Sequence, residues 1–110
     1  MDIQITTVKG VQLIQPIGRL DGDSAPSLGD AMRDALESGN TQLVLALDSV
    51  DYISSAGLRQ IVNAYKRAQK QGGDLRLSSP TERVMAVLEL AGLDRTLSIF
   101  PTDMDAIDSY

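Results

Sequence analysis

The stretch Asp51-Tyr52-Ile53-Ser54-Ser55-Ala56-Gly57-Leu58-Arg59 marks a change of structure in the middle of the chain. The run before it, Leu43–Leu47, is continuously apolar and has the length of a strand that is buried on both faces. The run after it places apolar residues at helical spacing, at Leu58, Ile61, Val62 and Tyr65. Two serines therefore occupy the point at which a strand gives way to a helix.

A helix that starts at this corner leaves its first backbone N–H groups without acceptors, and its dipole is positive at that end. Such a terminus can accept a negative charge, including a phosphate. Serine is also a preferred N-cap, so capping is the simpler role for both residues. The two roles are compatible if Ser54 caps the helix and Ser55 faces solvent.

The first twenty residues predict a β-hairpin. Apolar and polar residues alternate around Ile3 and Ile5 and again around Val11 and Leu13, and Lys9-Gly10 separates the two runs. Pro16 cannot donate to a sheet ladder, so we expect it near a strand end or an irregularity. Residues 18–23, Gly-Arg-Leu-Asp-Gly-Asp, are typical of a loop.

The remaining chain alternates helices and strands. We expect a first helix from near Ser24–Ser27 to Gly39-Asn40, a second helix that ends before Gly72-Gly73, and a strand around Leu75 and Leu77. The last elements are a helix capped by the box Ser79-Pro80-Thr81-Glu82, a strand at residues 97–100 and a short helix after Thr102. This order predicts a single α/β domain over residues 1–110, with a mixed, mainly parallel sheet of four to five strands, an N-terminal hairpin and about four helices.

Composition excludes several classes of function. The chain has 110 residues and a net charge of −5, which argues against nucleic acid or an anionic membrane as the main partner. It contains no cysteine and no apolar run of membrane-spanning length, so we expect a soluble, cytoplasmic protein that does not insert into a membrane.

Enzyme functions find little support. The chain has no histidine, so a serine nucleophile would have only lysine or a carboxylate as its base. Neither a Gly-x-Ser-x-Gly elbow nor a Walker loop occurs. Asp48 and Asp51 resemble the paired carboxylates of a glycosidase, but no aromatic sugar platform accompanies them. We expect no catalytic residues, no metal site and no cofactor.

With these elements in place, the chain resembles a STAS domain, the family shared by sulphate-transporter tails and bacterial anti-sigma factor antagonists. Nearly the whole chain takes part in the resemblance. The most specific marker is the run from Leu47 to Arg59. Weaker markers are Gly18-Arg19-Leu20-Asp21, Gly72-Gly73 and Ala91-Gly92-Leu93.

The resemblance implies a regulatory protein that is a substrate rather than an enzyme. In antagonists of this family, an anti-sigma factor that is also a serine kinase, of the histidine-kinase-like ATPase type, phosphorylates the serine two positions before the corner glycine. That serine is Ser55 here, since Gly57 is the matching glycine. Many members carry aspartate just before it, whereas this chain has Ser54, a second choice of acceptor. A serine phosphatase is the implied third component.

The expected partner surface follows from the same resemblance. It comprises the corner and the loop before the first helix: Asp21, Asp23, Tyr52, Ile53, Ser54, Ser55, Ala56, Gly57 and Arg59. Tyr52 and Ile53 are alternatively core residues, and Asp21 is alternatively a plain turn residue. If Asp21, Asp23, Asp48 and Asp51 converge, a phosphate at the corner adds charge to an acidic rim and repels an acidic partner.

A second class of function shares this fold. It is a STAS subunit that is not phosphorylated and belongs to a lipid-transport or stress-signalling assembly. Reversible phosphate on Ser55 and an ATPase-like kinase partner distinguish the antagonist from such a subunit, which would form a constitutive complex.

Overall fold

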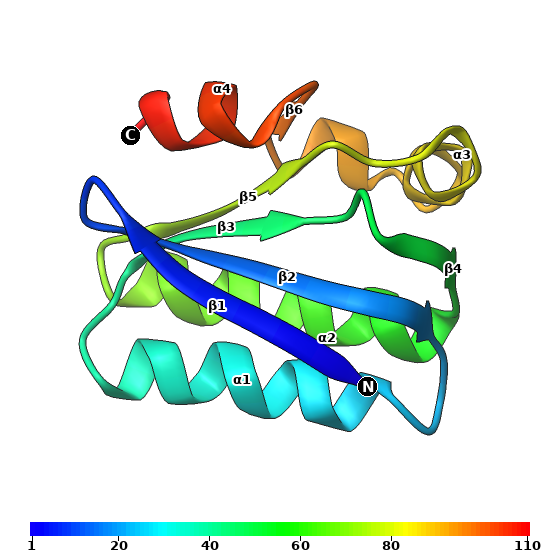
Figure 1. The fold of residues 1–110 in the computed structure, drawn as a ribbon, viewed down its shortest axis with the longest axis horizontal. Coiled ribbons are helices and arrows are strands. Elements are labelled where there is room, and N and C mark those ends of the chain that lie inside the picture. The colour runs from blue at the N-terminus through cyan, green and yellow to red at the C-terminus, as the bar shows by residue number, and fades with distance from the viewer.

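The computed structural model describes residues 1–110 and contains six strands and four α-helices (Figure 1). In chain order these are β1 (Asp2–Val8), β2 (Val11–Leu20), α1 (Ala25–Glu37), β3 (Gln42–Ala46), β4 (Val50–Ile53), α2 (Ser55–Lys70), β5 (Asp74–Ser78), α3 (Glu82–Leu90), β6 (Ile99–Phe100) and α4 (Asp103–Asp108). A single 3-10 turn, Leu93–Arg95, lies between α3 and β6. The α/β class, the hairpin and the four helices are as predicted.

The sheet has the order β1-β2-β3-β5-β6. Only β1 and β2 are antiparallel, while the β2–β3, β3–β5 and β5–β6 pairs are parallel. The connections from β2 to β3 through α1 and from β3 to β5 through α2 are the crossovers that parallel neighbours require. The sheet is therefore mixed and mainly parallel, as the alternation of elements predicted.

Strand β4 is the element that exceeds the predicted four to five strands. Strand β2 is ten residues long and outruns β3, whose pairing with it stops at Ile14. Beyond that point β4 takes over as the parallel neighbour, with Val50 opposite Gly18 and Ile53 opposite Leu20. The prediction of a loop from Gly18 was wrong for residues 18–20. These residues belong to β2 because they pair with β4, a strand that was not predicted.

The change of partner along β2 explains two residues within it. Pro16 lies between the stretch that pairs with β3 and the stretch that pairs with β4, so its missing N–H costs no ladder bond on that side. The register then shifts between Gly18 and Arg19, and Gly18 has a φ of 110°. Only glycine adopts such a conformation readily, and this bulge sets the register of the stretch of β2 that pairs with β4.

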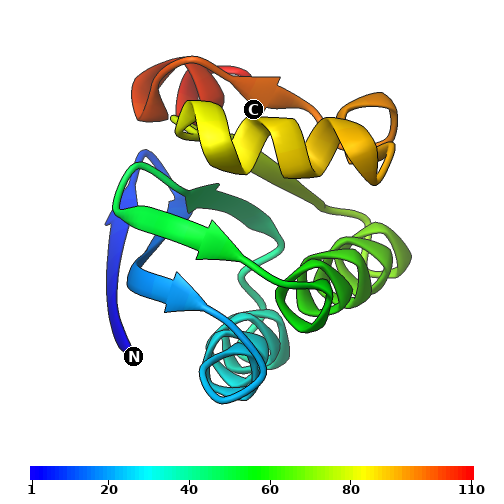
Figure 2. The same cartoon turned by 90° about the vertical axis from the view of Figure 1, so that its right-hand side faces the viewer.

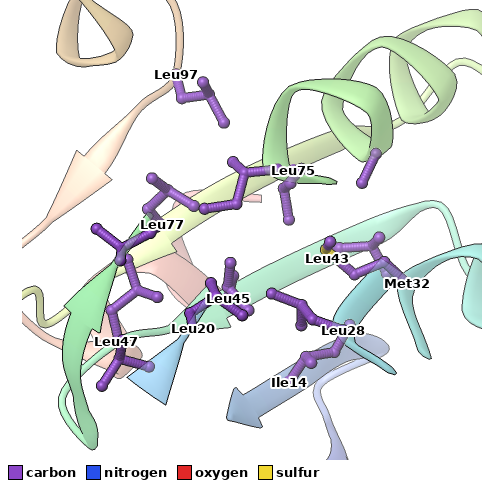
Figure 3. Close-up of a cluster of buried hydrophobic side chains, with 14 of the residues drawn as sticks. Ile14, Leu20, Leu28, Met32, Leu43, Leu45, Leu47, Leu75, Leu77 and Leu97 are labelled. Atoms are coloured by element: carbon purple, nitrogen blue, oxygen red, sulfur yellow. The ribbon is translucent and has the colours of Figure 1, made fainter. Parts of the chain in front are cut away.

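Two apolar clusters hold the layers together. The larger contains inward-facing residues of α1, α2 and α3 together with one face of the sheet, for example Leu28, Ile61, Leu88 and Leu45. Figure 3 shows part of this cluster, including Leu28 and Leu45. The smaller joins α4 to the other face through Ala106 and Ile107. Figure 1 shows α1 and α2 side by side beneath the sheet, with α4 above it.

The predicted caps were right for some helices and wrong for others. Helix α1 starts after Ser24, within the predicted range, and serine at this position would ordinarily cap the helix, but the Ser24 hydroxyl does not. It donates to the Arg19 carbonyl (2.6 Å) and accepts from the Asp21 N–H (2.9 Å) instead. The box predicted at Ser79-Pro80-Thr81-Glu82 was wrong, because Thr81 is the N-cap of α3 and its hydroxyl accepts from the Val84 N–H. The third helical residue is then Val84, which has no polar side chain to complete a box. Ser79 has a left-handed φ of 54°, and its hydroxyl binds Asp103.

The C-terminal residue Tyr110 fastens α4 to the sheet. Its hydroxyl accepts from the Leu43 N–H (3.1 Å) and lies 2.6 Å and 2.7 Å from the carbonyl oxygens of Leu43 and Asp74. The guanidinium of Arg76 stacks 3.9 Å from the ring centroid. Burial, and secondarily the charge of Asp74, raises the pKa of Tyr110 well above its ordinary value.

Replacement of Tyr110 by phenylalanine is expected to lower the free energy of unfolding by about 1–3 kcal/mol, because buried backbone groups lose their partner. The raised pKa also predicts a pH effect. The folded state favours the neutral phenol, so this stabilisation is complete below about pH 10 and is lost as the pH rises further. Thermal unfolding from neutral pH to about pH 11 should show a steeper alkaline decline for the wild type than for Tyr110→Phe. Parallel declines would contradict this role.

Candidate functional site

The two serines of the corner are placed differently. Ser54 is extended, with φ −96° and ψ 173°, and its N–H donates to the carbonyl of Leu20 at the end of β2 (2.8 Å). Its hydroxyl accepts from the Gly57 N–H (3.4 Å) and its carbonyl accepts from the Leu58 N–H (3.0 Å). Ser54 is thus the N-cap of α2, while Ser55 is the first helical residue and its side chain is exposed.

The first turn of α2 retains free donors. Capping by Ser54 satisfies the N–H of Gly57, and the helix itself satisfies that of Leu58, but the N–H groups of Ser55 and Ala56 have no acceptor in the protein. No acidic residue occupies this turn. The positive end of the helix dipole therefore coincides with an exposed hydroxyl, which is the arrangement the sequence predicted.

Close packing fixes the position of this corner. Gly57 is buried, and a Cβ atom there would lie 2.7 Å from Cγ of Leu20 and 3.1 Å from Cγ1 of Ile53. Those two side chains are themselves buried and belong to the main core. Because the backbone of α2 touches core side chains at its third residue, the Ser55 hydroxyl is held at a defined place on the surface.

Different effects are expected when the two serines are replaced by alanine. Ser54→Ala removes a cap and should lower the free energy of unfolding by about 1 kcal/mol. Ser55→Ala alters an exposed first-turn residue and should change it by less than about 0.5 kcal/mol. Urea unfolding of both variants measures the difference. A larger loss for Ser55→Ala would mean that this hydroxyl is part of the fold rather than free for chemistry.

The loop before α1 is organised by Asp21. Its carboxylate accepts from the backbone N–H groups of Ser24 (3.1 Å) and Asp23 (3.0 Å), and these bonds, the first above all, lower its pKa. Arg19 lies 3.9 Å away and adds a smaller attraction. Asp21 therefore has the role of a turn residue, which was one of the two interpretations of Asp21 from the sequence. Its part in partner binding remains a prediction.

Sequence reasoning missed one contributor to this surface. The guanidinium of Arg19 lies 4.2 Å from the ring centroid of Tyr52, because β2 and β4 pair these two residues directly. The pairing leaves the side chain of Arg19 exposed and that of Tyr52 half-buried. Arg19 and Tyr52 come together only through the pairing of β2 with β4, which was not predicted, so the local sequence around each residue did not indicate this contact.

The other predicted partner residues fall into two groups. Asp23 and Arg59 are exposed, and Ala56 is half-buried, so all three are available at the surface. Ile53 is 3% exposed and Gly57 is buried, so they position the corner and present no side chain to a partner. For Ile53, the core alternative is therefore the one that the structure bears out.

The acidic residues converge only in part. Asp21 lies at the end of β2, beside the end of β4, because the Ser54 N–H bonds to Leu20. Asp48 lies in the turn before β4, next to Ser49. The carbonyl of Ser49 accepts from the Gly18 N–H, so this turn is at the start of β4, whereas Ser55 follows the end of β4. The expectation that Asp48 joins a rim around Ser55 was wrong, since the whole length of β4 separates them.

The corner itself is not hollow. The two cavities of the protein have volumes of about 170 and 250 Å³ and lie elsewhere, between α1 and α2 and beside Gly72, Gly73 and Tyr110. No group of three or more acidic side chains is arranged to hold a metal ion. None of the helices has the length and apolar character needed to cross a lipid bilayer.

Comparison with known proteins agrees with this geometry. A family model described as the STAS domain matches residues 2–106. The anti-sigma-B factor antagonist of Bacillus subtilis is 34% identical over 82 residues, which cover 74% of this chain and 74% of that protein.

Solved structures show the same fold. A crystal structure from Thermotoga maritima superimposes with a TM-score of 0.92 at 31% identity and covers 97% of this chain and 92% of that one. The anti-sigma factor antagonist of Mycobacterium paratuberculosis superimposes with a TM-score of 0.90 at 25% identity and covers 98% and 92%. The chain therefore belongs to the STAS domain family, in the branch of the anti-sigma factor antagonists, which are regulators and not enzymes.

Proposed function

We propose that residues 1–110 act as one cytoplasmic STAS module that binds an anti-sigma factor while Ser55 is unmodified and releases it once Ser55 is phosphorylated. The partner is a serine kinase of the histidine-kinase-like ATPase type, and a serine phosphatase resets the switch. The main support for this proposal is that the two serines of the corner have different roles. Ser54 caps α2, and Ser55 stands exposed beside two free backbone N–H groups.

Charge explains why a phosphate would act on binding. Phosphorylation adds about −1.5 to −2 charges at neutral pH. The exposed hydroxyl lies on a surface that already includes Asp21 and Asp23 beyond the end of β2, with Arg19 as a nearby cation. A partner that is complementary to the unmodified corner would have to desolvate this new charge. Such mismatches cost several kcal/mol at an interface.

The contact surface follows from exposure. Its proposed members are the accessible residues of the corner and the adjoining loop: Asp21, Asp23, Tyr52, Ser54, Ser55, Ala56 and Arg59. Ile53 and Gly57 hold that surface in place from below. The backbone of the Ser54–Gly57 segment is rigidly anchored to β2 and to the core, so the surface is preformed for docking.

A pull-down from the native cell identifies the partner. Wild type and Ser55→Ala should capture a histidine-kinase-like ATPase, and Ser55→Asp should lose it, because aspartate places a permanent charge at the corner. Equal capture by all three proteins would contradict the switch and would favour a constitutive STAS assembly. Ser54→Asp is the matched control, since aspartate is as good an N-cap as serine.

A further inference from the structure

Strand β1 forms a free edge of the sheet. It pairs with β2 along its whole length, from Asp2 opposite Ile17 to Val8 opposite Val11, and with no other strand. Figure 2 shows β1 as the outermost strand on the left, with no helix beyond it. Its outer backbone groups are therefore open to solvent along seven residues.

The turn of the hairpin determines which backbone groups face outward. Lys9 and Gly10 both have positive φ, 53° and 79°, as in the two-residue turns that join tight hairpins. Such a turn is closed by a hydrogen-bonded pair, here Val8 and Val11. Hydrogen-bonded pairs alternate along an antiparallel ladder, so Asp2, Gln4, Thr6 and Val8 bond to β2. The N–H and C=O groups of Ile3, Ile5 and Thr7 point away from it.

Between the charged residues Asp2 and Lys9, this edge has none of the features that usually prevent pairing. Residues 3–8, Ile-Gln-Ile-Thr-Thr-Val, include no charge and no proline, and the register of β1 against β2 is continuous without a bulge. Ile5 is 47% exposed and Met1 is 38% exposed. Of the five large apolar side chains exposed on the protein, Ile5 lies on this strand, Met1 directly precedes it, and Ile17 lies on β2 opposite Asp2.

We propose that a second copy of this chain pairs with the first through β1, in an antiparallel two-fold arrangement centred on Ile5. In that register Ile5 faces Ile5 of the second copy, and Ile3 faces Thr7 of the second copy. These are the residues whose backbone groups point outward, so each of these pairs exchanges two backbone hydrogen bonds. Isologous pairing requires one surface to be complementary to itself, and this register meets that requirement.

Side chains and charges fit the same register. Ile3 and Ile5 lie on the face of the sheet that α1 and α2 cover, where Ile3 packs against the main core. Pairing would place the exposed surfaces of these two isoleucine side chains against those of the second copy, so that they form a continuous apolar contact. The charged ends also match, because an antiparallel arrangement brings Asp2 of one copy to the end that carries Lys9 of the other. The ammonium of Lys9 also pairs with Asp108 of its own chain (2.8 Å), so Asp2 would share this cation with Asp108.

The proposed dimer leaves both corners accessible. Strands β3 and β4 pair with the same edge of β2, β3 near its start and β4 near its end, and β1 pairs with the opposite edge. Ser55 follows β4 directly, so β2 stands between the switch corner and the dimer edge. Each dimer would therefore present two Ser55 corners to partners at once.

Sedimentation of the purified protein alone tests this inference separately from the proposed function. From about 1 μM to 1 mM the wild type should pass from monomer to dimer. Ile5→Lys places two like charges opposite each other and should raise the dissociation constant by about tenfold or more. Leu90→Lys, which alters a side chain that is 90% exposed on α3, should leave it unchanged. A wild type that stays monomeric, or equal effects of both variants, would overturn the proposal.

Single cysteines test the register, because the chain has no cysteine of its own. Ile5→Cys should form a disulfide-linked dimer under mild oxidation, since directly opposed residues have Cα atoms about 5.5 Å apart, within disulfide range. Thr7→Cys should not, because four residues along the strand separate its two copies by about 13 Å. Equal linkage of both variants, or none with Ile5→Cys, would contradict pairing centred on Ile5.

Discussion

A phosphate on Ser55 is expected to weaken binding to the anti-sigma factor by about 100-fold or more. Placing a charge against an uncompensated interface costs several kcal/mol, and each 1.4 kcal/mol corresponds to about a factor of ten in affinity. Ser55 is exposed at the first residue of α2 and lies close to the ends of both β4 and β2. A modification there would alter the proposed docking surface and not a peripheral region.

The weakening should occur without unfolding. The N–H groups of Ser55 and Ala56 are free, and the dipole of α2 favours a negative group at this end by about 0.3–1 kcal/mol. The phosphorylated protein should therefore be as stable as the unmodified one, or slightly more stable. A substantial loss of stability would mean that release follows from a damaged fold and not from charge at the interface.

Titration calorimetry with the purified partner measures this effect. Ser55→Asp carries part of the charge and should lose most of the affinity, while Ser55→Ala should bind like the wild type. Ser54→Asp places a charge one residue earlier, where aspartate can continue to cap α2. It should keep most of its affinity. Equal losses for the two aspartate variants would show that the partner senses total charge and not the Ser55 position.

Gly73→Ala is expected to lower the free energy of unfolding by about 3 kcal/mol or more. A Cβ atom at Gly73 would overlap the carbonyl oxygen of Thr41 and lie 2.7 Å from its carbonyl carbon. That carbonyl also accepts from the Asp74 N–H (2.9 Å) at the start of β5. Relief of the overlap would require backbone movement that breaks this bond between neighbouring strands.

Gly72→Ala is the matched control for this prediction. Gly72 has a φ of 80° and open space around it, so alanine there costs only the strain of a left-handed residue, about 1–2 kcal/mol. Urea unfolding of both variants should rank Gly73→Ala as clearly less stable. A reversed order would mean that the conformation of the turn, and not its contact with Thr41, is why two glycines follow α2.

The sequence predicted the features that depend on local chemistry. Alternation and turn residues placed the hairpin, and the apolar run from Leu43 placed the buried strand β3. The Ser-Ser corner was placed at the start of α2, because serine's capping preference and the helical spacing after it are both local. The sequence left open whether both serines cap the helix or only Ser54 does, and the structure assigns the cap to Ser54.

The features that were missed depend on contacts between distant segments. Strand β4 has only four residues and becomes a strand because β2 outruns β3. The stacking of Arg19 on Tyr52 and the separation of Asp48 from Ser55 both follow from that pairing. The role of Tyr110 depends on carbonyl groups of β3 and β5 that no pattern near the C-terminus indicates.

The most direct test of the central claim is a phosphorylation reaction with the captured kinase and ATP, followed by mass spectrometric mapping of the modified residue. Wild type and Ser54→Ala should each gain one phosphate on Ser55, and Ser55→Ala should gain none. Phosphate on Ser54, or equal modification of Ser55→Ala and the wild type, would contradict the assignment of the switch to the exposed hydroxyl at the start of α2.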